Sequence, residues 1–181
     1  MVMTKLTTEV TTDFVSALAQ LLFNPALRKT FLANPATAAD LLNLADEARP
    51  MFLSLSPQQV EHQAQLLITK RMRETFQQLP VTVKCLGPSV VATFTEYATQ
   101  YWPQTHRRHS DDALQFCQFL YTRQLPFNQS EYNRCRFRSD SKRLQVCLAK
   151  DAVVNGRLHL ALQVLYRRKG YQGEWRIYFK A

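Results

Sequence analysis

The change of hydrophobic period along the chain is the feature that most limits its fold. Up to about residue 125 apolar residues recur three or four positions apart, whereas beyond Pro126 they alternate with polar residues. A period near 3.6 is typical of amphipathic helices, and a period of 2 is typical of strands with one buried face. The sequence therefore predicts an α+β protein, with a helical layer over about residues 8–125 and an antiparallel sheet over about residues 133–180.

Residues typical of helix N-termini support the helical part. Asn24-Pro25, Asn34-Pro35 and Ser56-Pro57 each place a side chain that can cap a helix before a proline suited to the first turn. Ser110 precedes two aspartates and predicts a further N-terminus, where carboxylates complement the helix dipole.

The alternating segments predict a meander of three or four strands, and Asn155-Gly156 between two of them is a strong hairpin signal. We divide the chain into a helical part, 1–126, and a basic sheet, 127–181. We expect the apolar face of the sheet to pack on the helices as one compact unit, leaving its polar face exposed. The strand candidates are Arg134–Arg138, Arg143–Leu148, Leu158–Tyr166 and Trp175–Lys180.

The net charge of +9 belongs entirely to the second part of the chain. Residues 1–105 carry 8 Lys and Arg against 8 Asp and Glu, whereas residues 106–181 carry 15 against 6. Such asymmetry favours an acidic partner, which can be nucleic acid, an anionic membrane surface or an acidic protein. The alternative is a domain that is basic on one solvated side.

The polar face of the predicted sheet is the candidate binding surface. We expect a non-enzymatic adaptor or assembly-type protein that binds an acidic protein partner there. Binding of single-stranded DNA or RNA through the same surface is the alternative, because basic groups beside an aromatic ring can neutralise phosphates and stack bases. Lys and Arg also protect edge strands from pairing, which is a purely structural use. The candidate residues are Arg134, Arg136, Arg138, Arg143, Arg167, Arg168, Lys169, Arg176, Tyr178 and Lys180.

Signals of catalysis are weak. The sequence lacks a Walker loop, a G-x-G-x-x-G segment, a G-x-S-x-G elbow and an H-E-x-x-H helix. His106 and His109 lie close to Asp111 and Asp112, and could hold a metal or act as a base, but the sequence places no further ligand or nucleophile beside them. We therefore expect no catalytic residue, no metal site and no cofactor.

Cysteine usage and hydropathy suggest a cytoplasmic protein. No apolar run approaches the roughly 20 residues that span a bilayer, and the N-terminus lacks the apolar core of a secretory signal. The four cysteines form no C-x-x-C pair and fit buried thiols in a reducing compartment.

The stretch Phe14–Pro80, together with a later segment, resembles a known family. Pro25, Arg28, Phe31 and Pro35 nearly match the P-x-x-R-x-x-F-x-x-P segment of the small helical domains related to the α subunit of protocatechuate 4,5-dioxygenase, with one extra residue before the last proline. The same arrangement is similar to partner proteins of peptide-modifying iron enzymes, as in methanobactin biosynthesis. Those partners also carry a C-terminal β part, and FTEYATQYWP…LQFCQFL follows a similar rhythm to a segment of theirs. The resemblance covers about two thirds of the chain and implies a non-catalytic partner that docks on an enzyme and helps to grip a peptide.

Overall fold

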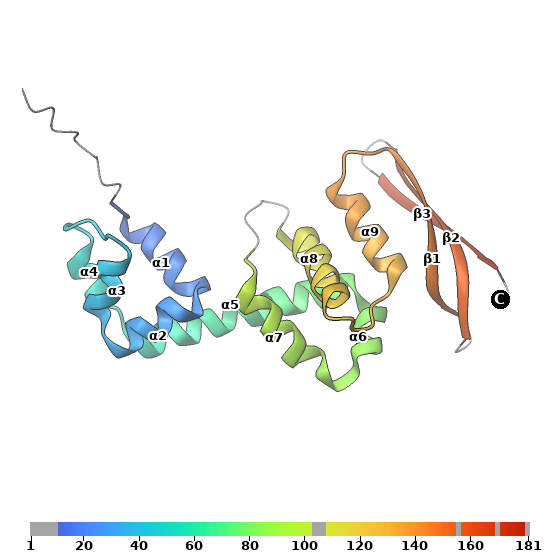
Figure 1. Ribbon diagram of the computed structural model, residues 1–181. Helices are drawn as coiled ribbons and strands as arrows, with labels where there is room; N and C mark the ends of the chain where they lie inside the picture. Colours follow the sequence, from blue (N-terminus) through green and yellow to red (C-terminus); the bar gives the residue numbers. More distant parts are fainter. Residues whose placement is uncertain (1–10, 103–107, 155–156, 169–170, 180–181) are drawn as a thin grey trace, which may run out of the picture. The chain divides into compact units, whose positions relative to one another are not determined.

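The structure, a computed structural model, describes residues 11–102, 108–154, 157–168 and 171–179 (Figure 1). Within these ranges the side chains of residues 108–109 and 151–159 are left out of the description. The chain divides into two compact units, Met1–Leu67 and Ile68–Ala181.

The first unit is helical, and the predicted asparagine caps are confirmed. Asn24 Oδ1 accepts hydrogen bonds from two amides of the following helix at 3.1 and 3.2 Å, and Asn34 Oδ1 does the same at 3.0 and 3.4 Å. Ser56 Oγ accepts from the amide of Gln59 at 3.4 Å. The helices are α1 (Phe14–Phe23), α2 (Pro25–Ala33), α3 (Pro35–Leu41), α4 (Arg49–Leu53) and the start of α5 (Pro57–Gln78).

The core of the first unit is built around Phe31 and Phe52, whose rings meet edge to face 5.2 Å apart. Arg28 of α2 is also buried, and its guanidinium donates to the carbonyl of Leu22 at 2.7 Å and to Glu61 at 3.1 Å. These bonds satisfy a charge that would otherwise be costly to bury.

The second unit begins inside α5 and packs its helices around an aromatic cluster. The ring centroids of Phe94 and Phe116 lie 5.1 Å apart, and those of Phe94 and Tyr97 lie 5.4 Å apart. Its further helices are α6 (Pro80–Leu86), the short 3₁₀ turn η1 (Gly87–Ser89), α7 (Val90–Gln100), α8 (Arg108–Thr122) and α9 (Gln129–Ser139).

A buried ion pair joins two of these helices. Arg71 of α5 donates twice to Asp112 of α8, both at 2.9 Å, and once to the carbonyl of Tyr101. Burial by itself would lower the pKa of Arg71, but the hydrogen bonds and charge of Asp112 raise it. The predicted cap at Ser110 is wrong, because α8 already begins at Arg108 and Ser110 lies within its first turn. Asp112 is turned into the core.

The sheet follows the helices and confirms the α+β class. Its strands are antiparallel in the order β1 (Leu144–Val154), β2 (Arg157–Arg168) and β3 (Tyr171–Phe179). The register of β1 on β2 shifts between Ala149 and Ala152. The predicted Asn155-Gly156 turn lies outside the described residues.

The strand predicted over Arg134–Arg138 is wrong, because this segment belongs to α9. The helix is buried on two sides, toward the helical core and toward the sheet. Glu131 and Cys135, four residues apart, face the helices, whereas Asn133 and Phe137 contact β2. Because the helix is buried along two stripes, every second residue from Glu131 to Phe137 is buried, and the sequence alternates as it would in a strand. The helical part consequently reaches Ser139 instead of residue 126.

Among the described residues, no helix is long and apolar enough to cross a membrane.

Candidate docking face of the sheet

One face of the sheet packs on α9, and it is the more polar of the two. Ala161, Gln163 and Leu165 of β2 are buried on this inner face. Gln163 Oε1 accepts from the side chain of Asn133 at 3.0 Å, and Gln163 Nε2 donates to the carbonyl of Ser130 at 2.9 Å. Because the amide is fully bonded, its burial carries little penalty.

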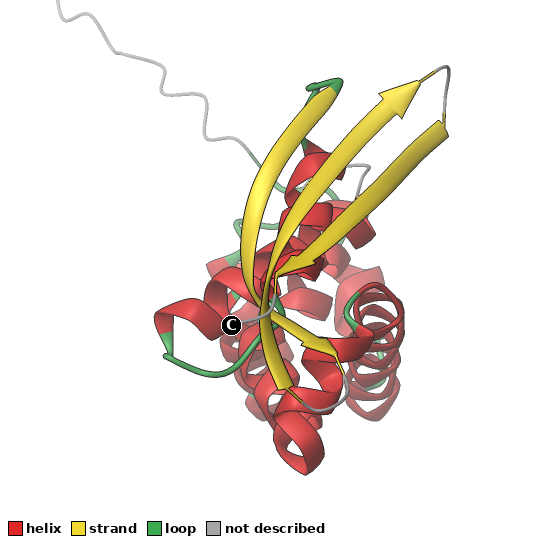
Figure 2. Ribbon diagram, turned by 90° about the vertical axis from the view of Figure 1, so that its right-hand side faces the viewer, coloured by secondary structure: helices red, strands yellow, loops and turns green. Residues whose placement is uncertain are grey.

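The opposite, outer face of the sheet is apolar and exposed. Figure 1 places α9 along one side of the strands, and Figure 2 shows the other side uncovered by any described element of the second unit. The register sets apolar side chains opposite one another on this face, with Trp175 69% exposed. We call these residues the outer face: Leu144, Val146, Leu148, Leu160, Leu162, Val164, Tyr166, Tyr171, Trp175, Ile177 and Phe179.

The prediction that the apolar face packs on the helices is therefore wrong. Alternation along the strands identified which residues share a face. It could not show which face is covered, because α9 offers polar partners to the sheet through Asn133 and the Ser130 carbonyl. The signal that could have revealed this is the pair Ala161 and Gln163, since small and amide side chains allow close approach and hydrogen bonding.

The outer face is large. Each side chain on one face of a sheet takes up about 30 Å² of its plane, so eleven positions cover about 350 Å² before their protruding surfaces are counted. The largest apolar patch on the surface of a monomeric protein has about this extent and is often functional.

The charges around the outer face are basic. Arg168 is exposed at one end of the face, and Lys150 is exposed beside the β1 bulge. Among the described strand residues, none of those whose side chains lie on the outer face is acidic. The whole second unit, residues 68–181, carries 19 Lys and Arg against 8 Asp and Glu, a net charge of +11.

Four of the predicted binding arginines, Arg134, Arg138, Arg167 and Arg176, form hydrogen bonds or ion pairs within the protein. Arg134 lies 3.9 Å from Glu131 and 3.8 Å from Glu174, and Arg176 pairs with the same Glu174. Burial alone would raise the pKa of Glu174, but the hydrogen bonds of Arg176 and Gln163 and the charge of Arg134 hold it below its ordinary value.

The remaining predicted residues are scattered. Arg138 donates to Gln78 at 3.2 Å, and Arg167 donates to the carbonyl of Phe137 at 3.1 Å. Lys169 and Lys180 lie outside the described residues. Exposed side chains are those of Arg136 on α9, Arg143 before β1, Arg168 at the end of β2, and Arg176 and Tyr178 on β3. Their role in binding stays a prediction, but they do not form the single strand-borne surface that we expected.

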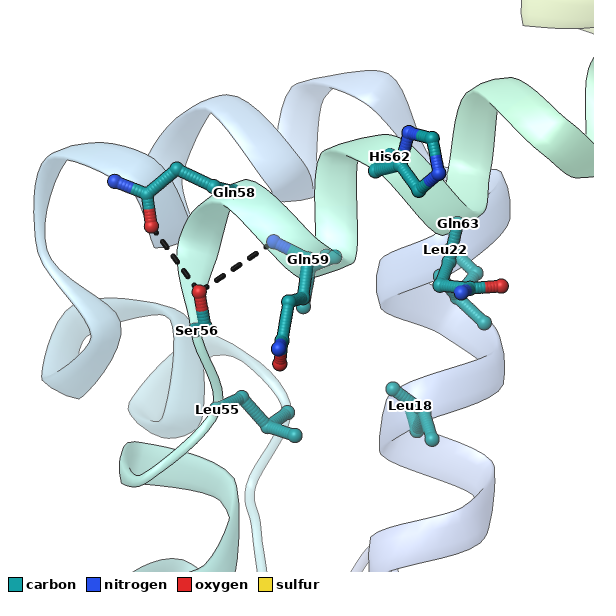
Figure 3. Close-up of a pocket in the computed structure, with 9 residues that line it drawn as sticks. Leu18, Leu22, Leu55, Ser56, Gln58, Gln59, His62 and Gln63 are labelled. Carbon is teal, nitrogen blue, oxygen red and sulfur yellow. Dashed lines mark hydrogen bonds between the residues drawn. The ribbon is translucent and has the colours of Figure 1, made fainter.

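A separate groove of about 820 Å³ lies in the first unit. Figure 3 shows Leu18 and Leu22 of α1 on one side and Leu55 and Gln59 on the other. It holds no cluster of titratable groups, since His62 is the only ionisable residue among those that line it. The groove thus suits apolar contact and offers no acid–base pair.

Metal-ligating groups do not gather within the described part of the chain, where no three His, Cys, Asp or Glu side chains could hold an ion. His106 and the side chain of His109 lie outside that part. Cys117 and Cys135 are buried, as free thiols. Burial raises the pKa of Cys135 to about 11, so this thiol is a poor nucleophile near neutral pH.

No family model, curated protein or solved structure matches the chain. The resemblance to the dioxygenase α subunit and to the partners of peptide-modifying enzymes therefore stays a prediction.

Proposed function

We propose that this chain is a non-enzymatic adaptor or assembly-type protein that binds another protein through the outer face of its sheet. The observation that carries the proposal is that face itself, an apolar surface that spans all three strands and is left uncovered by the described helices of its unit. Burial of apolar area is the main favourable term in protein association.

Size supports a protein partner over a small ligand. Small molecules bind in concave pockets that enclose most of their surface. The outer face is instead an open sheet surface, and Trp175, Ile177 and Phe179 of β3 are all more than 40% exposed. A second layer of secondary structure could cover these side chains at the spacing of about 10 Å found between stacked sheets.

Charge indicates the chemistry of the partner. The outer face has basic residues at its border, and its unit carries a net charge of +11. We infer a partner with an apolar patch flanked by acidic side chains, because opposite charges speed encounter and suppress wrong partners. A second copy of the chain fits less well, since two units of the same strong charge repel each other.

Nucleic-acid binding, the alternative from the sequence, loses support from the ion pairs of Arg134 and Arg176. Guanidinium groups held by Glu174 are less available to phosphates. A cytoplasmic location belongs to the proposal and rests on the four free cysteines.

A site-specific crosslink tests the proposal. The full chain is produced with the photoreactive residue p-benzoylphenylalanine in place of Trp175, in the cells from which it comes. A matched chain carries it in place of Tyr121 on α8, which is 74% exposed but lies off the sheet. We expect one discrete protein adduct at position 175, absent at position 121, with an acidic protein as the crosslinked species.

Two further measurements separate the contribution of charge to binding from that of apolar contact. Raising the salt from 50 to 500 mM in an extract should slow the formation of the adduct at position 175, because steering is screened. Adding Ile177→Lys should abolish it. Crosslinks to nucleic acid, to a second copy of this chain or to no discrete species would each overturn the proposal.

A further inference from the structure

The described sheet has two outer strands, and only β3 is paired regularly along its whole length. β2 lies between β1 and β3, so each outer strand has a single described strand beside it (Figure 2). β3 pairs with β2 in one unbroken register over all nine of its residues, from Tyr171 to Phe179. The pairing of β1 is instead interrupted by the shift between Ala149 and Ala152.

The edge of β1 carries features that hinder pairing with another chain. Lys150 lies at its bulge, and the Lys150 amide already donates to the side-chain oxygen of Gln129 on α9 at 3.1 Å. Bulges and lysines are common means of protecting an edge strand. β3 has neither a bulge nor a lysine or proline between Tyr171 and Phe179, and α9 packs mainly against β1 and β2. The edge of β3 is therefore the one suited to a further strand.

The hydrogen bonds of the sheet identify the main-chain groups on that edge. The amide of Arg167 donates to the carbonyl of Arg143 at 2.8 Å, so Arg167 directs its main-chain groups toward β1. Successive residues of a strand direct these groups to opposite sides, so Tyr166 and its alternate neighbours bond to β3. Their partners on β3 are the residues of the outer face. The residues between these partners direct their N–H and C=O groups away from β2, and they are Gln172, Glu174, Arg176 and Tyr178.

The two sides of β3 indicate which side chains an added strand would carry. A strand at this edge continues both faces of the sheet, so its side chains on one side lie beside Trp175 and Ile177, which are apolar and exposed. Its side chains on the inner side lie beside polar residues, among them the ion pair of Glu174 and Arg176. The net charge of +11 on the unit favours acidic side chains there.

We propose that the free edge of β3 binds an extended strand of the acidic partner protein, antiparallel to β3, with apolar side chains on the outer face and acidic or hydroxyl side chains on the inner face. This inference rests on the proposed function, because the added strand widens the apolar surface that the partner covers. Main-chain hydrogen bonds supply affinity in this mode of binding, and the alternating side chains supply specificity. The antiparallel direction is favoured because it is slightly more stable per residue than the parallel one.

A synthetic peptide tests the edge directly. The peptide has the sequence Glu-Val-Thr-Val-Glu-Val-Thr-Val-Glu with blocked termini, and calorimetry with the full chain should show that one peptide binds per chain. With valines on the outer face, the amides of both threonines and of the central glutamate face β3. Methylating these three amide nitrogens should weaken binding at least about tenfold, because each methyl group removes a hydrogen-bond donor. Methylating the first three valine amides, which face away from β3, should weaken it less than about threefold.

Proline variants remove a donor from the protein side of the edge. Arg176→Pro deletes an N–H that points away from β2, a position at which an edge strand tolerates proline. Arg176→Thr is the matched variant, because it loses the same side chain and keeps the N–H. The peptide should bind at least about fivefold more weakly to the proline variant than to the threonine variant. Tyr178→Pro and Tyr178→Thr are a second pair, to be used if thermal unfolding shows that Arg176→Pro does not fold.

Three results would overturn strand addition at this edge. One is the absence of saturable peptide binding to the wild-type chain below about 1 mM. Another is an equal loss of affinity in the two methylated peptides, and the third is equal affinity of the peptide for the proline and threonine variants.

The photocrosslink at position 175 separates a failure of this inference from a failure of the proposed function. With the photoreactive residue at that position, Arg176→Pro should lose most of the acidic protein adduct that Arg176→Thr retains. An equal adduct in both variants would reject strand addition and leave the outer face as the docking surface. Peptide binding that passes the tests above, without an adduct in the wild-type chain, would support strand addition and overturn the proposed function.

Discussion

The buried carboxyl group of Glu131 links α9, the helix that packs on the sheet, to the start of α6. It accepts hydrogen bonds from the amides of Val81 and Thr82 at 2.8 and 2.9 Å, and from the hydroxyl of Thr82 at 2.8 Å. The α6 helix begins with Pro80 and has no cap from its own N-cap side chain. Glu131 thus satisfies orphan amides of a helix about 50 residues away in the sequence, which no local pattern reveals.

Replacing Glu131 by Gln should lower the free energy of unfolding by about 2 kcal/mol, because the new NH₂ group would face donors and leave a buried amide unpaired. Glu96→Gln is the matched control, since Glu96 forms an exposed pair with Arg123 and should cost less than about 0.5 kcal/mol. Urea unfolding followed by circular dichroism measures both. Equal costs for the two variants would contradict the capping role.

At the scale of the elements, one glycine shapes the outer face. Gly173 of β3 lies opposite Tyr166 of β2, and a Cβ built on Gly173 would overlap the Tyr166 ring. Tyr166 also meets Trp175 edge to face, with ring centroids 6.3 Å apart. An aromatic side chain laid over a glycine on the next strand compensates for the missing side chain.

Gly173→Ala should destabilise the protein by about 1–3 kcal/mol, because the added methyl group displaces the ring. Combining it with Tyr166→Leu should cost less than the sum of the two single changes, since the overlap then disappears. Thermal unfolding of the two single variants and the double variant gives the comparison. Strict additivity would show that the ring does not lie over the glycine in solution.

At the scale of the whole molecule, apolar surface and positive charge occur in the same unit. Exposed apolar faces of this size bind environment-sensitive dyes and favour association. The double variant Trp175→Lys/Ile177→Lys should lower the fluorescence of a bound anilinonaphthalene sulfonate by at least about half. The variant adds positive charge, so the loss cannot come from weaker attraction of the anionic dye.

Tyr121→Lys is the control for this measurement, because Tyr121 is exposed on α8 and does not belong to the outer face. It should leave the fluorescence nearly unchanged. A similar loss in both variants would place the dye elsewhere and remove the outer face as the main exposed apolar surface.

The sequence predicted the elements where the signal is local. The caps of Asn24 and Asn34 and the alternation of β1, β2 and β3 act through neighbours in the chain, so propensity and period reveal them. The same reasoning failed for α9, because burial on two sides gave a helix the period of a strand. The sequence also did not predict which face of the sheet is covered. Gln163 and Asn133, whose hydrogen bond helps to decide this, lie 30 residues apart in the sequence, so no local pattern reveals their contact.

The sequence by itself determined the class of the fold, the succession of a helical part and an antiparallel sheet, and which residues of the three strands share a face, since each of these follows from local backbone geometry. Only the tertiary structure decided which face of the sheet is covered. Gln163 and its partners on α9 satisfy one another's hydrogen bonds, so the polar side of the strands could be buried and the apolar side left exposed. That choice depends on groups brought together from distant segments, and it moves the surface available to a partner from the arginines to the apolar residues around Trp175.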